Sequence, residues 1–257
     1  MEVVNTQFDL QAFYQQLASA ESLLLMLDYD GTLAPFTTER DKAVPYPLIV
    51  GTLEGLLASD RTRVVIISGR TVDDLKKVLS LENTPELWGC HGLERYSREG
   101  QYSIIELSDD VREKLSVLYN WTAENQLVNF CEFKPSGGAF HWRGLPKDEE
   151  ELIHQKVVDR WRNEADAAHL DLIEFDGGIE IRVAGTNKSS PVAQLMSESS
   201  DQIVAAYLGD DRTDEDAFEA IKGRGAAVLV NENLRDTRAD IWIRPPDELD
   251  DFLRRWI

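Results

Sequence analysis

Short apolar segments recur toward both ends of the chain, each about as long as a buried β-strand. Amphipathic patterns lie between several of them, with apolar residues at helical spacing over residues 72–79 and 191–196. Such alternation is typical of a doubly wound parallel sheet, in which active groups lie beyond the carboxyl ends of the strands. The apolar segments are Leu23–Leu27, Val64–Ile67, Leu87–Cys90, Ile203–Leu208, Ala226–Val230 and Ile241–Ile243.

The middle of the chain follows a different pattern. Ser108 can cap a helix that extends to about Asn125 with apolar residues on one face. Two strand-like segments, 128–134 and 139–143, then flank the turn-rich sequence Pro-Ser-Gly-Gly and predict a hairpin. A second helix is expected over about residues 148–168. The pattern in the middle of the chain therefore predicts helices and hairpins rather than strands joined by crossover helices.

A second predicted hairpin completes this middle region, with strands at Leu170–Phe175 and Ile179–Val183 on either side of Asp-Gly-Gly. We therefore predict an α/β fold with two parts. A doubly wound, Rossmann-like parallel sheet forms a core from residues 1–105 and 185–257. An α+β cap domain, residues 106–184, is inserted into it.

The composition narrows the choice of partners. The 257 residues include 47 acidic and 27 basic side chains, for a formal net charge of −20. This charge repels polyanions, so we expect no nucleic-acid partner and no membrane binding. A phosphorylated substrate would need a local site, built from a cation, a lysine and backbone N–H groups, that overrides the average field.

Other features of the chain point to a cytoplasmic setting. The first ten residues hold no basic run followed by an apolar stretch, so no signal peptide is predicted. The apolar run Leu23–Leu27 is too short to cross a bilayer. The two cysteines, Cys90 and Cys131, are far apart in the sequence, which argues against a disulfide framework.

Carboxylates follow two of the predicted strands directly. Asp28 and Asp30 come after the first apolar segment, and Asp210 comes after Ile203–Leu208 in the sequence GDDRTDED. Either cluster alone could be an acidic turn, because Asp and Gly are common turn residues. If the two strands are neighbours, however, the carboxylates converge and repel unless a cation neutralises them. Ligand sets made of oxygen alone favour Mg²⁺ over zinc.

Two further segments suit phosphate chemistry. Ser68, Gly69 and Arg70 follow a predicted strand and open a helix, and Lys188 stands just before another helix. A hydroxyl, backbone N–H groups and an ammonium all bind phosphate oxygens. Taken singly, Ser68 could be an ordinary helix-start residue and Lys188 a solvated surface lysine. Their order after the aspartate motifs favours the functional reading.

Together these segments resemble the four motifs of the haloacid dehalogenase superfamily. They read DYDGT at 28–32, SGR at 68–70, Lys188, and GDDRTDED at 209–216. The resemblance implies a phosphatase that forms an aspartyl-phosphate, which splits one slow displacement into two easier ones.

The resemblance also implies a role for each matching residue. Asp28 would be the nucleophile and Asp30 the general acid and base. Mg²⁺ would be bound by Asp28, Asp30 and Asp210, while Ser68 and Lys188 would offset charge on the transferring phosphoryl group. The remaining implied residues are Thr32, Gly69 and Arg70 at the substrate, and Asp211 and Asp214 as supporting residues.

The predicted cap domain carries polar residues that alternate with apolar ones, in the segments 131–134, 141–143 and 178–182. On a strand this alternation sends Glu132 and Lys134 to one face. A solvated sheet face with cross-strand ion pairs would explain the pattern equally well.

With His-Gly-Leu-Glu at 91–94, these segments resemble the trehalose-6-phosphate phosphatase family over nearly the whole chain. In that family a glutamate and a lysine from one cap strand, and a glutamate from a later strand, bind the disaccharide. The resemblance thus implies Glu132, Lys134 and Glu180 as sugar ligands, and hydrolysis of trehalose 6-phosphate to trehalose and inorganic phosphate. His141 and Arg143 are further implied substrate residues.

One residue departs from the family pattern, because Ser189 follows Lys188 where a glycine is usual. This leaves the geometry of that loop open. Two alternatives also stay open: a phosphatase of a sucrose or glycosylglycerate phosphate, and a non-catalytic sugar-phosphate-binding subunit. The intact pair of Asp28 and Asp30 argues against the second. We expect a monomer, and the resemblance allows association with a trehalose-phosphate synthase.

Overall fold

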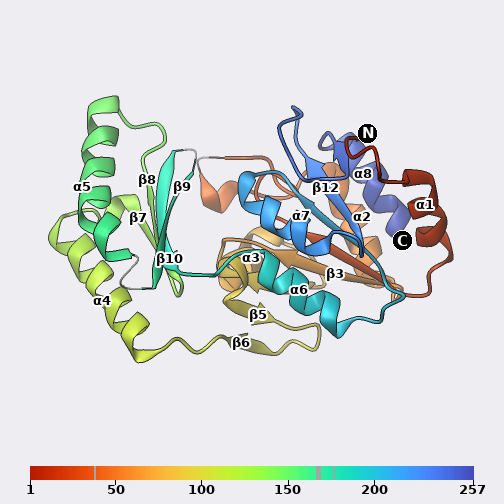
Figure 1. Cartoon of the computed structure of the whole chain (residues 1–257), viewed down its shortest axis with the longest axis horizontal. Coiled ribbons are helices and arrows are strands. Elements are labelled where there is room, and N and C mark those ends of the chain that lie inside the picture. Colours follow the sequence, from red (N-terminus) through yellow and green to blue (C-terminus); the bar gives the residue numbers. More distant parts are fainter. Residues whose placement is uncertain (38, 166–168, 176) are drawn as a thin grey trace. The chain divides into compact units, whose positions relative to one another are not determined.

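The chain folds into two compact units. The core unit comprises Met1–Ser103 and Asn187–Ile257, and the inserted unit comprises Ile104–Thr186 (Figure 1). Each boundary lies two residues from the one expected from the sequence. The computed structural model describes residues 1–37, 39–165, 169–175 and 177–257.

A mostly parallel sheet forms the centre of the core unit. Its strands are β1 (Glu2–Val3), β2 (Leu23–Leu27), β3 (Thr62–Ile67), β4 (Glu86–Gly89), β5 (Glu94–Tyr96), β6 (Tyr102–Ile104), β11 (Val204–Gly209), β12 (Ala226–Val230) and β13 (Ile241–Ile243). Within the described residues the order of these nine strands is β1-β13-β12-β11-β2-β3-β4-β5-β6. The strands from β13 to β4 run parallel, whereas β1 and β5 pair antiparallel with their neighbours β13 and β4.

Helices cover both faces of this sheet. Successive side chains of a strand point to opposite faces, so an entirely apolar strand needs packing partners on both. Leu25 and Leu27 of β2 pack with four of the helices, while Leu24 and Met26 pack with the other two. The first group is α1 (Leu10–Ser19), α2 (Pro47–Ala58), α3 (Val72–Leu79) and α8 (Asp247–Leu253), and the second is α6 (Ser189–Glu198) and α7 (Glu215–Ile221). The central strands are therefore buried on both faces, which explains their continuous apolar sequences.

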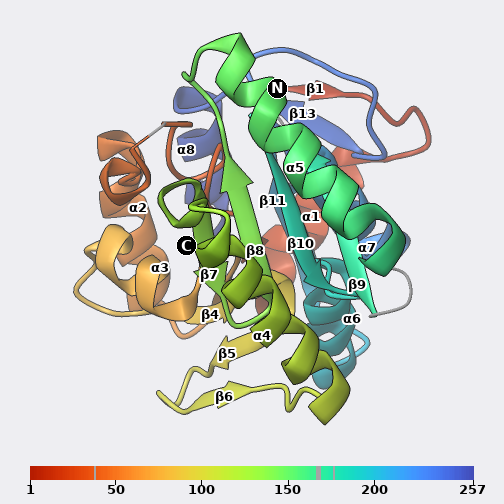
Figure 2. The same cartoon turned by 90° about the vertical axis from the view of Figure 1, so that its left-hand side faces the viewer.

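The inserted unit is an α+β sandwich of two helices on one antiparallel sheet. Its elements are α4 (Asp109–Glu124), β7 (Cys131–Lys134), β8 (Gly137–His141), α5 (Lys147–Ala165), β9 (Leu170–Phe175) and β10 (Gly178–Val183). The strand order is β7-β8-β10-β9. Figure 2 shows α4 and α5 over one face of this sheet, where Phe140, Trp161 and Ile179 are fully buried.

The predicted fold class is confirmed, with local corrections. Ser108 caps α4 as expected, its hydroxyl accepting a hydrogen bond from Val111 N–H. Residues 128–130 form a 3₁₀ turn rather than a strand. The first hairpin turn is shorter than predicted because its two glycines belong to β8. A Cβ at Gly137 would lie 1.9 Å from the carbonyl oxygen of Ile181, so only glycine fits there.

Three strands were not predicted, and two predicted segments fall on residues that the structure does not describe. The strands β1, β5 and β6 are missing from the predicted set, because strands of two or three residues, partly exposed, have no apolar run to mark them. Residues 166–168, the predicted end of the second cap helix, and Asp176, in the second predicted turn, lie outside the described residues. In the described part of the chain, no helix is long and apolar enough to cross a membrane.

Candidate active site

Three functional residues predicted from the sequence meet at one edge of the core sheet. The strands β11, β2 and β3 are parallel neighbours. Their carboxyl ends are followed directly by Asp210, Asp28 and Ser68. Since the carboxyl ends of parallel strands lie at the same edge, the fold gathers these polar groups where ligands bind in doubly wound sheets.

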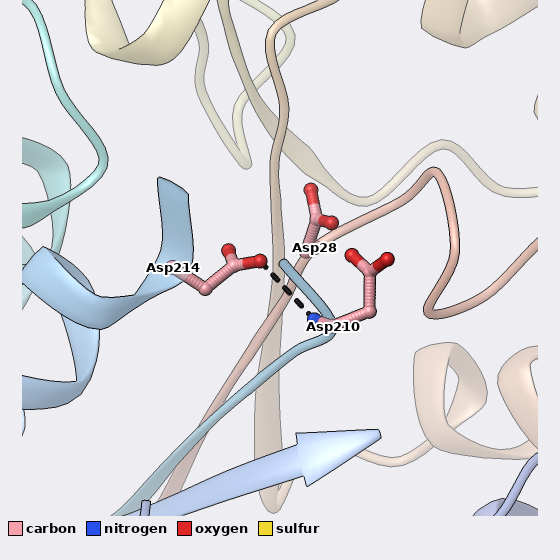
Figure 3. Close-up of side chains that lie close together, drawn as sticks. All are labelled: Asp28, Asp210 and Asp214. Carbon is pink, nitrogen blue, oxygen red and sulfur yellow. Dashed lines mark hydrogen bonds between the residues drawn. The ribbon is translucent and has the colours of Figure 1, made fainter. Parts of the chain in front are cut away.

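An acidic cluster lies at this edge. Asp28, Asp210 and Asp214 are buried, and each offers a carboxylate oxygen within 4.8 Å of the others (Figure 3). Close packing requires glycine nearby, because a Cβ at Gly31 would lie 2.0 Å from Asp210 Oδ2. Lys188 Nζ lies 2.7 Å from Asp28 Oδ1 and 2.8 Å from Asp214 Oδ1. One ammonium among three carboxylates leaves an excess of buried negative charge.

Asp214 organises the cluster. Its Oδ1 accepts hydrogen bonds from Lys188 Nζ and, at 2.6 Å, from Tyr207 O–H. Its Oδ2 accepts from the backbone N–H groups of Asp210 (3.1 Å, dashed in Figure 3) and Asp211 (3.0 Å). Four donors thus occupy both oxygens of Asp214. This carboxylate is better placed to hold the loop and Lys188 than to bind a ligand.

The pKa values of the cluster reflect burial and mutual repulsion. Burial raises the pKa of Asp28, although Lys188 acts in the opposite direction. Burial, and then the charges of Asp28 and Asp214, raise the pKa of Asp210 well above its usual range. Among the described residues, Asp210 Oδ1 has no hydrogen-bond partner. The carboxylates of Asp28 and Asp210 therefore fit a divalent cation that prefers oxygen ligands.

The other residues predicted for phosphate binding lie on the loops around this cluster. The Ser68 hydroxyl is buried and accepts a hydrogen bond from Arg70 N–H at 3.2 Å. The Thr32 hydroxyl is also buried, without a partner among the described residues. Gly69 packs against the ring of His91, so that a Cβ at Gly69 would lie 2.7 Å from its Nε2. These loops can present hydroxyls to a ligand, and the contact with His91 leaves no room for a side chain at Gly69.

Asp30 and Arg70 pair with each other instead of joining the acidic cluster. The carboxylate of Asp30 is not part of the acidic cluster that the described residues form. Its two oxygens accept hydrogen bonds from Arg70, at 2.7 Å from Nε and 2.6 Å from Nη2. The Arg70 guanidinium, expected at the substrate, is thus directed at Asp30.

Asp211, expected to support the site, has an exposed side chain that accepts a hydrogen bond from Arg212 N–H at 2.6 Å.

In the inserted unit, the predicted sugar ligands lie on one sheet face. Lys134 Nζ donates to Glu180 Oε1 at 2.9 Å, and His141 Nε2 lies 3.4 Å from Glu132 Oε2. Arg143 lies beyond the end of β8, exposed, with its side chain against Gly177. The structure thus pairs Glu132 with His141 on the neighbouring strands β7 and β8, and Lys134 on β7 with Glu180 on β10 across β8. Arg143 lies apart from these pairs.

Two buried polar residues were given no role from the sequence, although Arg182 lies in the segment 178–182 that resembles the family. Tyr207, on β11, supports Asp214, and burial followed by the charge of Asp214 raises its pKa, which keeps its proton available as a donor. Arg182 is buried 3.6 Å from Glu180, and its Nε and Nη1 have no hydrogen-bond partner in the described part of the chain. A polar residue inside an otherwise apolar strand was the signal available for Tyr207.

Comparison with solved structures defines the class of the fold. A haloacid dehalogenase-like hydrolase from Bacteroides thetaiotaomicron superposes with a TM-score of 0.62 at 15% identity, covering 92% of this chain and all of the other. The core unit thus has the haloacid dehalogenase fold, as the four motifs predicted.

Sequence comparison then identifies the family. The trehalose-phosphatase family model matches residues 26–238. Trehalose-phosphate phosphatase B of Arabidopsis thaliana is 28% identical over 93% of this chain and 67% of its own length. A bifunctional trehalose-6-phosphate synthase/phosphatase of Thermoproteus tenax is 30% identical over 83% of this chain and 29% of its own length. The chain belongs to the trehalose-phosphatase family, which confirms the predicted phosphatase class.

Proposed function

We propose that this chain is a Mg²⁺-dependent phosphatase that converts trehalose 6-phosphate into trehalose and inorganic phosphate through an aspartyl-phosphate on Asp28. One observation carries the mechanism: buried Asp28 and Asp210 meet at adjacent strand ends, with Lys188 Nζ 2.7 Å from Asp28. Such a site combines a carboxylate nucleophile with cationic groups for a phosphoryl dianion.

Each residue has one task in this mechanism. An oxygen of Asp28 attacks phosphorus while the bond from phosphorus to the sugar oxygen breaks, and Asp30 gives that oxygen a proton. Asp30 then takes a proton from water, whose oxygen attacks phosphorus and releases Asp28. Lys188 and the Ser68 hydroxyl stabilise the charge of the phosphoryl group.

Asp28 and Asp210 would hold the Mg²⁺, which neutralises charge on the phosphoryl oxygens when bound. Arg70 donates to both oxygens of Asp30, which argues against its carboxylate as a third Mg²⁺ ligand. We therefore keep for Asp30 only the proton transfer that the family resemblance implies. The unpartnered oxygen of Asp210 and the excess of buried negative charge support this assignment of the cation site.

The substrate assignment rests on the inserted unit and on the relatives. Glu132, Lys134 and Glu180 offer carboxylate and ammonium groups on one sheet face, and such groups match the hydroxyls of a disaccharide. The names of the Arabidopsis and Thermoproteus relatives support trehalose 6-phosphate as the ester. We also propose a cytoplasmic setting, in line with two cysteines that form no disulfide.

The Thermoproteus relative joins a synthase and a phosphatase in one chain. This supports a proposal that the present chain associates with a trehalose-phosphate synthase. Co-elution of the two purified proteins would test it.

The proposed function is tested by phosphate release with Mg²⁺ across trehalose 6-phosphate, sucrose 6-phosphate, glucose 6-phosphate and a glycosylglycerate phosphate. We expect the highest kcat/KM with trehalose 6-phosphate. A preference for another ester would keep the mechanism and replace the substrate. Binding of these sugar phosphates without turnover of any would favour the non-catalytic subunit.

Glu132→Ala should lower kcat/KM for trehalose 6-phosphate by about 10- to 100-fold, since a hydrogen bond to a charged group contributes roughly 1.5–3 kcal/mol. A small aryl phosphate has no sugar, so its kcat/KM should change less than about twofold. Glu174→Ala is the matched control, because Glu174 is an exposed glutamate on β9 of the same sheet. Equal losses with both substrates would remove Glu132 from the sugar site.

A further inference from the structure

The Asp30 carboxylate is held by a two-pronged ion pair. Arg70 Nε donates to Asp30 Oδ2 at 2.7 Å and Arg70 Nη2 donates to Asp30 Oδ1 at 2.6 Å. A planar guanidinium that meets a carboxylate through two parallel bonds fixes its direction as well as its distance. Both side-chain torsions of Asp30 are thereby restrained.

Arg70 itself is fixed from several sides. Its side chain is only 4% exposed. Its backbone N–H donates to the Ser68 hydroxyl, and its carbonyl accepts from Cys90 N–H at 2.7 Å. The guanidinium carbon lies 5.6 Å from the ring centroid of Tyr29, whose own O–H donates to the Ala43 carbonyl at 2.6 Å. The guanidinium fork is therefore pre-organised before it meets Asp30.

Asp30 needs such a partner because its side chain is 33% exposed. A partly solvated aspartate would otherwise sample several rotamers. Proton transfer requires a donor within hydrogen-bond reach of the leaving oxygen. A displacement of about 1 Å in such a group can cost ~10²-fold in rate.

We propose that Arg70 is a positioning residue that holds Asp30 for proton transfer, rather than a ligand of the substrate phosphate. The proposal rests on the proton-transfer role given to Asp30 in the proposed function. It assigns to the arginine of the Ser-Gly-Arg segment a task that its sequence position alone does not reveal. The task is defined by two hydrogen bonds and by the burial of the guanidinium.

The test measures kcat/KM of the Arg70→Gln variant with two substrates whose leaving groups differ in their need for a proton. A sugar alkoxide must be protonated as it leaves, whereas 4-nitrophenolate leaves without a proton. We expect kcat/KM for trehalose 6-phosphate to fall by ~10²-fold and kcat/KM for 4-nitrophenyl phosphate to fall less than about threefold. The inhibition constant of inorganic phosphate should not change. Arg70→Lys keeps the charge without the fork, so it should recover only part of the loss.

A double-mutant cycle separates positioning from simple stabilisation of the fold. In an Asp30→Asn background, Arg70→Gln should produce no further loss with trehalose 6-phosphate, because the two residues act as one unit. Arg95→Gln is the matched control. Arg95 also pairs with a carboxylate through both terminal nitrogens, at 2.7 and 2.9 Å from Glu198, but it lies on β5. It should leave the ratio between the two substrates unchanged.

Four results would overturn the proposal. Equal losses with both esters and a weaker inhibition by phosphate would make Arg70 a phosphate ligand. Equal losses of kcat/KM with both esters, together with a lower melting temperature, would show that Arg70 is a structural residue. Additive losses in the double mutant would show the same. If the wild type prefers another glycosyl phosphate, the same ratio on that ester decides the role of Arg70. A wild type inactive on every ester would overturn the proposed function and this proposal together.

Discussion

Asp28→Asn is expected to abolish phosphate release, with a loss of at least ~10⁴-fold, as for other enzymes that lose their nucleophile. An amide oxygen is a poor nucleophile and cannot form the acyl-phosphate. The variant should fold, because Lys188 keeps its contact with Asp214 at 2.8 Å when the charge of Asp28 is removed. The measurements are phosphate release, and acid quenching with radiolabelled substrate to trap the phosphoenzyme.

Asp216→Asn is the control for this variant, since Asp216 is an exposed carboxylate in the first turn of α7. It should retain activity close to that of the wild type. Substantial phosphate release by a folded Asp28→Asn protein would overturn the nucleophile assignment. A phosphoenzyme that forms on Asp28→Asn would do the same.

Asp210→Asn should separate activity from stability. Removing one of two proposed cation ligands should weaken Mg²⁺ binding and lower kcat/KM by at least ~10³-fold. Without Mg²⁺, however, the variant should be more stable than the wild type at neutral pH. In the wild type without Mg²⁺, burial beside Asp28 and Asp214 forces the Asp210 carboxyl group to keep a proton at neutral pH, which costs free energy, and one of its oxygens has no hydrogen-bond partner in the described chain. A neutral amide avoids the cost of that proton.

The pH dependence of this effect has a definite sign. Burial, followed by the neighbouring carboxylates, raises the pKa of Asp210, so the native state keeps a proton that the unfolded chain has released. The free energy of unfolding of the metal-free wild type should therefore fall as pH rises above the usual carboxyl range. The slope should reach at most about 1.4 kcal/mol per pH unit for each retained proton.

Chemical unfolding at several pH values, with and without Mg²⁺, measures these differences. The metal-free Asp210→Asn protein should show a shallower slope against pH, and its free energy of unfolding should rise less than that of the wild type when Mg²⁺ is added. Asp211→Asn, at the exposed neighbouring carboxylate, should match the wild type because asparagine also caps helices well. An Asp210→Asn protein stabilised by Mg²⁺ as strongly as the wild type would exclude Asp210 from the cation site.

Much of the fold follows from local patterns in the sequence. The central strands of the core are buried on both faces, so their apolar sequences mark them without reference to any partner. Ser108 marks the start of α4 because a hydroxyl can satisfy a free N–H group at a helix end. The short strands β1 and β5 depend on pairing with β13 and β4, so no local pattern reveals them.

The sequence by itself determined the class of the site: carboxylates after two strands, with a serine and a lysine beside helix starts. Only the tertiary structure decided how these groups are partnered. It joins Arg70 to Asp30 across 40 residues and gives Asp214 four donors, including Tyr207 and Lys188. Residue type and strand position are local properties, whereas hydrogen-bond partners depend on which strands are neighbours and on how closely their ends pack.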